Sequence, residues 1–331
     1  MKDTTNISPD DIQHCVLESG DVSVTILSLG CITHDWRVPL GNTHVPVLQS
    51  FANPRDHLEN GEAFMGAIVG RVANRIGGAR YRQNGQEIRL QANEGPNQLH
   101  GGPFGIGRQL WTMDPDGQNA VRLTHHSADG AQGFPGAVKF SVTIRLEGHR
   151  LTYEMHALPN QPTPINLAQH SYYNLMGSGD IRSHKLQIPA NSFTPVDSAM
   201  LPTGDIASIE GEALDFRTLS KISDADPAGE GFDINLVLQG NDGPAAQVIA
   251  PNGLQLKLWT DQPCLQLYTS QGLTQTAPAL TGQHHGPFAG LCLELQHFPD
   301  SVNNPQFPSI ICTPEQPYQQ KLVVEIKDMS V

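Results

Sequence analysis

Cationic residues are scarce in this chain. Its 331 residues include 20 lysines and arginines against 33 aspartates and glutamates, which gives a formal net charge of −13 and a pI of about 5.4. Nucleic acids and anionic membranes attract basic surfaces, so both are poor candidates as partners. Charged residues of both signs make up only 16% of the chain. An acidic, sparsely charged surface is compatible with a neutral small-molecule ligand.

Long hydrophobic runs are also missing. No segment is long and apolar enough for a transmembrane helix, and the N-terminal stretch MKDTTNISPDDIQHC lacks the apolar region of a signal peptide. The five cysteines are widely spaced and form no CxxC pair. Cys31, Cys264 and Cys292 lie beside apolar residues, as is typical of buried free thiols. These features predict a reducing compartment, the cytoplasm.

Motifs that define several common enzyme classes are absent. The chain has no HxH or HExxH motif and no Cys/His cluster with metal-ligand spacing, so we expect no metal site. It also has no GxxxxGK[ST] phosphate loop and no GxGxxG dinucleotide fingerprint. The GxSxG nucleophile elbow of many hydrolases is missing too.

Helical periodicity is weak, and strand patterns recur from end to end. Glycine (32) and proline (25) are frequent, which favours tight turns over long helices. Apolar residues alternate with period two in five runs: 22–26, 140–146, 151–155, 254–258 and 322–326. Hairpin turns are indicated by four dipeptides: Asn84-Gly85, Asp116-Gly117, Asp242-Gly243 and Asn252-Gly253.

The strand pattern predicts the fold class. We expect an all-β protein, a large antiparallel β-sandwich, in which residues 1–331 form a single domain. One short helix is expected at residues 56–64. The segment 195–231, which is rich in Pro, Gly and Asp, fits either a long connection or a set of short strands.

The segment 289–309, AGLCLELQHFPDSVNNPQFPS, places one carboxylate in an otherwise apolar strand. Side chains alternate along a strand, so its leucines share one face, and Glu294 shares the other with Cys292 and Gln296. A carboxylate is costly to bury unless partners or a substrate use it. The face of Glu294 is therefore either solvated or part of a ligand site. The run rich in His, Pro, Asp and Asn that follows favours a site at the strand end.

Four further segments concentrate polar residues suited to ligand binding. They are GRVANRIGGARY (70–81) with Asn74 and Arg75, NQLHGG (97–102) with His100, TPINLAQHSYYNL (163–175) with His170, and GFDINLVL (231–238) with Asp233. The two glycines after His100 allow a backbone to approach a ligand closely. Each residue also has an ordinary structural explanation. Arg75 fits a surface cation, Asp233 a turn cap, and each histidine a core residue.

The ordered set of these segments resembles the aldose 1-epimerase (galactose mutarotase) family. The matching phrases are SLGCIT (28–33), GRVANRI (70–76), LHGGPFGIGRQLW (99–111), DGAQGFPG (129–136), TPINLAQHSYYNL (163–175), TPVDSAMLPTG (194–204), LDFR (214–217), GFDINLVL (231–238) and LELQHFPDSVN (293–303). A single phrase is weakly specific, but the ordered set covers about residues 22–324. The family fold is a large antiparallel β-sandwich, in agreement with the strand pattern.

The resemblance implies a reaction and the residues for it. The family interconverts the α and β anomers of free aldoses such as glucose and galactose, and it needs no cofactor. By motif position, Glu294 is the general base and His170 is the general acid. Sugar hydroxyls and the ring oxygen are assigned to the other matched residues: Asn74, Arg75, His100, Asp233 and Gln266. The expected partner is a free monosaccharide, and the expected assembly is a monomer or a homodimer.

The chain departs from the common family pattern at four positions. Ile234 and Leu295 stand where His and Thr are common, and Ser270 and Gln271 replace a frequent Gly-Asn pair. These departures leave the preferred sugar open, as well as the pocket wall near Gln266.

Three alternative functions remain open at this stage. A non-catalytic sugar-binding relative would have no need of a matched acid and base. A sugar-phosphate epimerase would need extra cations, which the cluster of Arg71, Arg75, Arg80 and Arg82 could supply. A glycosidase would need a second carboxylate beside Glu294, and Asp233 is the candidate.

Overall fold

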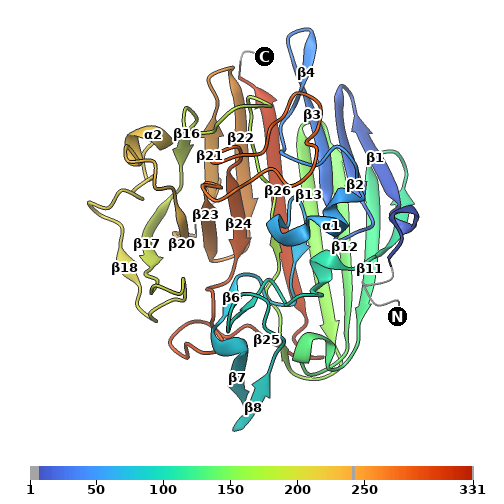
Figure 1. Cartoon of the computed structure of the whole chain (residues 1–331), viewed down its shortest axis with the longest axis vertical. Coiled ribbons are helices and arrows are strands. Elements are labelled where there is room, and N and C mark those ends of the chain that lie inside the picture. Colours follow the sequence, from blue (N-terminus) through green and yellow to red (C-terminus); the bar gives the residue numbers. More distant parts are fainter. Residues whose placement is uncertain (1–6, 241–242, 330–331) are drawn as a thin grey trace.

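Antiparallel strands dominate the computed structural model, which describes residues 7–240 and 243–329 (Figure 1). The largest sheet within these ranges has nine strands in the order β10-β11-β12-β13-β26-β22-β21-β16-β19. The bounds, in this order, are Thr112–Asp116, Ala120–Ser127, Val138–Glu147, Arg150–Pro159, Tyr318–Asp328, Leu254–Thr260, Ala246–Ile249, Lys185–Gln187 and Ser220–Lys221. Figure 1 shows the long strands β11, β12, β13 and β26 side by side along the longest axis.

A second sheet has five strands in the order β18-β17-β20-β23-β24. Its strands are Ala207–Ser208, Ala190–Thr194, Asp233–Leu238, Cys264–Tyr268 and Cys292–Gln296. A third sheet contains β1 (His14–Ser19), β2 (Val22–Leu27), β3 (Thr33–Leu40) and β4 (Thr43–Pro46). Four short pairs complete the strands: β14 (Thr163–Pro164) with β25 (Ile311–Cys312), β15 (Ala168–Gln169) with β5 (Ile68–Val69), β6 (Arg75–Ile76) with β9 (Gln98–Leu99), and β7 (Arg80–Gln83) with β8 (Gln86–Arg89).

The sheets share one hydrophobic core. On β12 the buried positions alternate strictly with more exposed ones, which is the period-two pattern of the sequence. Val142 and Ile144 from the nine-stranded sheet belong to the same buried cluster as Leu265 and Leu293 from the five-stranded sheet and Val24 from the third. Packing of sheet faces around one core confirms the predicted all-β sandwich.

Helices are few and short within the described ranges. The expected helix at 56–64 is confirmed only in part, because α1 covers Asp56–Glu59 and is followed by a 3₁₀ turn at Gly61–Ala63. Phe64 then takes a left-handed conformation with φ 51° and ends the turn. The segment 195–231 contains β18, β19 and a helix that the sequence analysis did not predict, α2 (Ile222–Ala225). Further 3₁₀ turns lie at Pro9–Asp11, Gly77–Ala79, Ile106–Arg108 and Ala131–Gly133.

Three of the predicted hairpin turns are confirmed. Asn84-Gly85 joins β7 to β8, and Asn252-Gly253 lies between β21 and β22. Asp116 ends β10, and Gly117 begins the turn into β11. The fourth turn includes Asp242, which lies outside the described residues. None of the described helices has the length and apolar character needed to cross a membrane.

Candidate active site

All seven residues that the sequence analysis assigned to a site line one cavity of about 460 Å³. Three of them lie on the five-stranded sheet: Asp233 on β20, Gln266 on β23 and Glu294 on β24. The other four, Asn74, Arg75, His100 and His170, come from short strands and the turns beside them. Segments separated by more than two hundred positions in the chain thus converge on one space.

The five-stranded sheet fixes the positions of the first three residues. Gln266 lies directly opposite Glu294 in the antiparallel register of β23 and β24, so both side chains lie on the same face. The Nε2 of Gln266 donates a hydrogen bond of 2.6 Å to Oδ1 of Asp233. Glu294 is only 2% exposed, so of the two alternatives left open by the sequence the solvated outward face is excluded and the ligand site is favoured.

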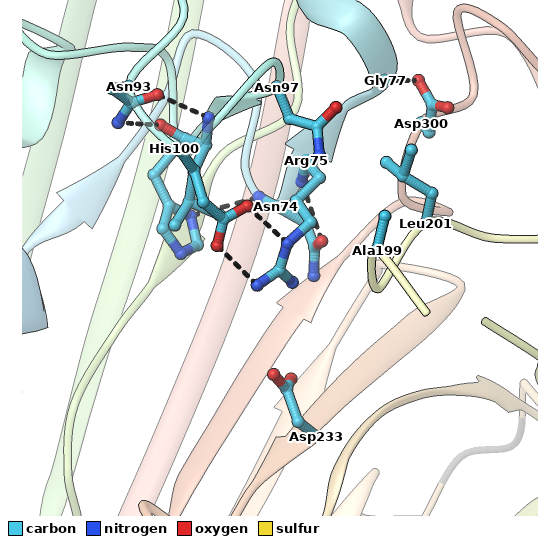
Figure 2. Close-up of polar contacts among 12 residues, drawn as sticks. Asn74, Arg75, Gly77, Asn93, Asn97, His100, Ala199, Leu201, Asp233 and Asp300 are labelled. Carbon is cyan, nitrogen blue, oxygen red and sulfur yellow. Dashed lines mark hydrogen bonds and ion pairs between the residues drawn. The ribbon is translucent and has the colours of Figure 1, made fainter. Parts of the chain in front are cut away.

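The pairing of β6 with β9 brings Asn74 beside His100. Both residues have a left-handed backbone, with φ 62° and φ 51°. The backbone N–H of Asn74 donates to Nδ1 of His100 over 3.1 Å, and the N–H of His100 donates to the carbonyl oxygen of Asn74 over 3.1 Å. Figure 2 shows the two side chains on the same side of the cavity, together with Arg75.

The backbone hydrogen bond determines which atom of His100 faces a ligand. A backbone N–H can only donate, so Nδ1 is the acceptor and the ring hydrogen of neutral His100 sits on Nε2. Burial first, and then the nearby His170 and Arg75, lower the pKa of His100 well below its ordinary value, so the ring stays neutral. His100 is therefore a hydrogen-bond donor at the cavity.

The hydrogen bond from Asn74 to His100 Nδ1 also decides whether His100 can bind a metal ion. His100, His170 and Glu294 have candidate ligand atoms that all lie within 4.8 Å of one another. A metal ion needs a free lone pair on each histidine nitrogen that binds it. The lone pair of His100 Nδ1 is occupied by the N–H of Asn74, and Nε2 carries the hydrogen. This donor set suits hydrogen bonding to an oxygen-rich ligand and does not fit a metal ion.

Arg75 is not an ordinary surface cation, because its side chain is 14% exposed and forms a two-pronged ion pair with Glu94. Its Nε and one terminal nitrogen donate to the two carboxylate oxygens of Glu94 over 2.7 Å each. The pair holds the guanidinium in place, and Figure 2 shows Asp233 across from Arg75. The role of Glu94 could not be predicted from the sequence, because no local pattern links this residue to Arg75.

His170 and Glu294 lie close together in the cavity. Their Nε2 and Oε1 atoms lie 3.6 Å apart, and both side chains are almost completely buried. Burial raises the pKa of Glu294 to about 8, with a further rise from Asp233 and an opposing effect of Arg75. Burial lowers the pKa of His170 to about 4. At neutral pH the contact is therefore between a carboxylic acid and a neutral imidazole, and not an ion pair.

Three aromatic side chains that were not assigned from the sequence also line the cavity: Phe64, Tyr172 and Tyr268. Tyr172 stacks on His170 with ring centroids 5.2 Å apart, and Phe64 contacts His100 edge-on at 4.8 Å. Tyr268 lies beside Tyr172 and also lines the cavity. Tyr172 lies in the phrase HSYYNL directly after His170, so the motif itself carried a signal for it. Phe64 had none, because its left-handed turn follows no periodic pattern.

The four departures from the family pattern lie away from this space. Ile234 and Leu295 pack in or against the hydrophobic core. The Oγ of Ser270 donates to the carbonyl oxygen of Gly290 over 2.6 Å, and Gln271 accepts from Thr269. Of the described residues that line the cavity, none is one of these four. None of the four departures therefore forms the cavity wall near Gln266.

The fold and the cavity define a β-sandwich protein with a polar cavity and a buried pair of carboxyl and imidazole groups. The family model described as aldose 1-epimerase matches residues 13–325. The chain is 38% identical over 311 residues to a galactose mutarotase from Rattus norvegicus, which covers 91% of this chain and 90% of that protein. It is 34% identical over 328 residues to an aldose 1-epimerase from Escherichia coli (strain K12), which covers 94% of each.

Solved structures agree with these sequence relatives. An aldose epimerase homologue from C. elegans is similar with a TM-score of 0.91 and 26% identity, over 96% of this chain and 99% of that chain. A galactose 1-epimerase from Lactobacillus acidophilus is similar with a TM-score of 0.80 and 26% identity, over 96% and 98% of the two chains. The chain belongs to the aldose 1-epimerase family.

The turn after His100 generates a first prediction. Gly101 has φ 84°, and a Cβ added there would collide with the carbonyl oxygen of Gly70. We expect Gly101→Ala to lower the free energy of unfolding by several kcal/mol, measured by urea denaturation. Gly148→Ala is the matched control, because Gly148 also has a positive φ of 57° but nothing lies within 4 Å of its Cβ position. It should cost about 1 kcal/mol. Equal losses in the two variants would contradict the steric argument.

The burial of Glu294 predicts a pH-dependent gain in stability for Glu294→Gln. The unfolded chain loses this proton above its ordinary pKa, whereas the folded protein keeps it up to about pH 8. The folded state therefore binds more protons, and its stability falls as the pH rises between these values. A glutamine has no such penalty. We expect the Tm of Glu294→Gln to exceed that of the unchanged protein by on the order of 5 °C at pH 8 and by much less at pH 5.

Glu325→Gln provides the control for this measurement. Burial raises the pKa of Glu325, but hydrogen bonds from Arg150 and Lys327 outweigh it and lower the pKa overall. Its carboxylate therefore stabilises the folded state above its ordinary pKa and loses this effect as the pH falls. Glu325→Gln should lower the Tm at pH 8. A Glu294→Gln variant that behaved like Glu325→Gln would show that Glu294 is stabilised as a carboxylate.

Proposed function

We propose that this protein interconverts the α and β anomers of free aldoses, with Glu294 and His170 as the acid–base pair. One observation carries the assignment: Nε2 of His170 and Oε1 of Glu294 lie 3.6 Å apart in a cavity lined by hydrogen-bonding groups. General acid–base catalysis needs two such groups within reach of one substrate. No oxidation and no group transfer occurs, so the reaction is an isomerisation.

The reaction consists of two proton transfers and their reversal. Glu294 as a carboxylate takes the proton of the anomeric hydroxyl, while His170 as an imidazolium gives a proton to the ring oxygen. The bond between C1 and the ring oxygen breaks, and the open-chain aldehyde rotates about C1–C2. Closure on the other face of the carbonyl returns both protons. Each positioned group contributes on the order of a hundredfold or more to such a rate.

The pKa shifts that burial imposes on Glu294 and His170 fit the middle of this cycle. Ring opening converts the carboxylate and imidazolium into a carboxylic acid and a neutral imidazole. That is the state which burial favours in the sugar-free cavity, since the pKa of Glu294 rises and that of His170 falls. The pair holds one proton before and after ring opening, so binding of the sugar requires only a shift of that proton from Glu294 to His170.

The remaining residues are proposed to hold the sugar. His100 donates from Nε2, and the Arg75 guanidinium, held by Glu94, donates beside Asn74. Asp233 accepts hydrogen bonds from sugar hydroxyls while Gln266 fixes its orientation. Fixed donors and acceptors of this kind favour ligands that match them, because an unmatched buried polar group is penalised.

A phosphorylated sugar is less favoured by the same site. Arg71 is buried and donates to Ser127 and to the carbonyl oxygens of Ala128 and Pro135. Arg80 and Arg82 are exposed on β7, and neither borders the cavity among the residues described there. Arg75 is already paired with Glu94. The four arginines therefore do not converge on a phosphate, in contrast to the sequence-based alternative.

The wider setting of the protein is also a proposal. One domain spanning residues 1–331 is supported by a family match over 13–325. A cytoplasmic location is supported by the five free cysteines, of which Cys31, Cys264 and Cys292 are buried. The acidic charge supports a small-molecule partner over nucleic acid. Whether the assembly is a monomer or a homodimer is measured by sedimentation.

Polarimetry on freshly dissolved α-D-glucose, α-D-galactose and α-D-xylose tests the function. We expect the protein to accelerate mutarotation above the spontaneous rate, and the relative rates rank the sugars. Glu294→Gln and His170→Asn should each lose at least a hundredfold in kcat, because neither replacement transfers a proton. A folded protein without effect on any free sugar would refute the proposal. A loss in His170→Asn confined to KM would make His170 a binding residue and not the acid.

The shared proton predicts the pH dependence of kcat/KM. Below about pH 4 both groups are protonated and no base remains, and above about pH 8 both are deprotonated and no acid remains. We therefore expect a broad bell-shaped profile with limbs near these values, measured by polarimetry and corrected for the spontaneous reaction. An activity that kept rising above pH 9 would show that no acid on the protein is required.

A further inference from the structure

A row of polar side chains crosses the five-stranded sheet beside the acid–base pair. Thr194 on β17 lies opposite Asn235 on β20, Asn235 lies opposite Gln266 on β23, and Gln266 lies opposite Glu294. Directly opposed residues of antiparallel strands share a face, so all four side chains lie on the face of the active site. Thr194 and Asn235 do not border the 460 Å³ cavity among the described residues that line it, and no role has been assigned to them so far.

Four atoms of this row are buried without a hydrogen-bond partner among the described residues. One is Oε2 of Glu294, which belongs to the active site, and the other three lie farther along the row. These three are Oγ1 of Thr194, Nδ2 of Asn235 and Oε1 of Gln266, and none has a partner among the residues that the structure describes. The three residues are 0%, 1% and 5% exposed. Buried polar atoms are almost always satisfied by the protein or by ordered water, so three orphans in one row require an explanation.

The three residues line a second, small cavity behind the active site. This cavity has a volume of about 10 Å³ and is also bordered by Arg75 and Asp233. Such a volume is close to the lower limit for a single water molecule, which needs two to four polar partners. An apolar space of this size would stay dry, but this one contains three unsatisfied polar atoms.

The orientation of the two amides is fixed by their other hydrogen bonds. Nε2 of Gln296 donates to Oδ1 of Asn235 over 3.3 Å, which leaves the Nδ2 donor of Asn235 free. Nε2 of Gln266 donates to Oδ1 of Asp233 over 2.6 Å, which leaves the Oε1 acceptor of Gln266 free. Burial raises the pKa of the Cys264 thiol, and a side-chain hydrogen bond from Asn235 opposes this larger effect. Sulfur is a weak acceptor, and the amide nitrogen of Asn235 carries a second hydrogen that remains available.

We propose that one ordered water molecule occupies this small cavity and that, through it, Thr194 and Asn235 are positioning residues for Gln266 and Asp233. The water accepts a hydrogen bond from Asn235 Nδ2 and donates to Gln266 Oε1 and Thr194 Oγ1. It thereby completes a chain of hydrogen bonds that runs from Gln296 through Asn235, the water and Gln266 to Asp233.

The water determines which way the Gln266 amide points. With its oxygen bound by the water, Gln266 presents its nitrogen to Asp233 and holds the carboxylate that accepts hydrogen bonds from the sugar. If the amide rotated by half a turn, its oxygen would face the carboxylate oxygen, and two acceptors would repel each other. Loss of the water contacts therefore weakens sugar binding and leaves the proton transfers of Glu294 and His170 in place.

A crystal structure of the sugar-free protein at high resolution tests the water directly. We expect one water oxygen at about 2.7–3.1 Å from Thr194 Oγ1, Asn235 Nδ2 and Gln266 Oε1. A dry cavity, or a Gln266 amide that turns its oxygen to Asp233, would overturn the proposal. This test does not depend on the proposed function, so its result stands even if the protein accelerates no mutarotation.

The positioning role rests on the proposed function and is tested by kinetics. Thr194→Val and Asn235→Leu remove a water contact with little change in volume. We expect each to raise KM for the sugar about tenfold while kcat stays within about twofold, as loss of uniform binding predicts. The hydrogen bond from Gln266 lowers the pKa of Asp233 against the effect of burial, so its loss should also move the acidic limb of kcat/KM to higher pH.

Thr33→Val is the matched control for the kinetic test. Thr33 is a buried threonine whose Oγ1 lies 2.7 Å from the hydroxyl of Tyr153, outside the active site. It should lose stability without a change in KM or in the pH profile. Unchanged KM in Thr194→Val and Asn235→Leu, with circular dichroism like that of the unchanged protein, would refute the positioning role. If either variant does not fold, the other variant and the crystal structure decide.

Discussion

The structure of the site depends on the burial of one carboxylate. Burial of a charged carboxylate is unfavourable by several kcal/mol, and this cost raises the pKa of the group so that it binds a proton. The raised pKa of Glu294 shows this effect, and the neighbouring Asp233 strengthens it, while Arg75 opposes it. Because Arg75 is itself bound to Glu94, its positive charge is partly offset and does not fully ionise Glu294. The arrangement keeps the acid–base pair at one shared proton.

In the proposed site, hydrogen bonds within the protein orient the groups that are assigned to the sugar. Asn74 fixes the ring hydrogen of His100, Glu94 fixes the guanidinium of Arg75, and Gln266 fixes the carboxylate of Asp233. Each ligand-facing group is thus held by a second group that does not need the sugar. A sugar that binds finds its donors and acceptors already oriented, so little entropy is lost in ordering side chains when it binds.

Local sequence patterns predicted the sandwich because strands and tight turns are local features. The alternation along 140–146 and the Asn84-Gly85 pair each depend on neighbours in the chain. The site residues could be placed together only through the family resemblance, because no periodic pattern in the sequence predicts the pairing of β6 with β9. The contact of Glu94 with Arg75, the contact of Phe64 with His100 and the burial of Glu294 arise from segments that are distant in the sequence, so no local pattern predicts them. The helix α2 was missed because its four residues are too few to show a helical period.

Both strands and turns border the cavity, and they differ in how well they tolerate changes of length. Asp233, Gln266 and Glu294 lie on hydrogen-bonded strands, whereas Glu62 borders the same cavity from a 3₁₀ turn and Thr274 borders it from an irregular loop. A strand cannot gain or lose one residue without turning its side chains to the opposite face. Turns tolerate insertions and deletions. Changes of length are therefore easier to accommodate at Glu62 and Thr274 than along the strands that carry Asp233, Gln266 and Glu294.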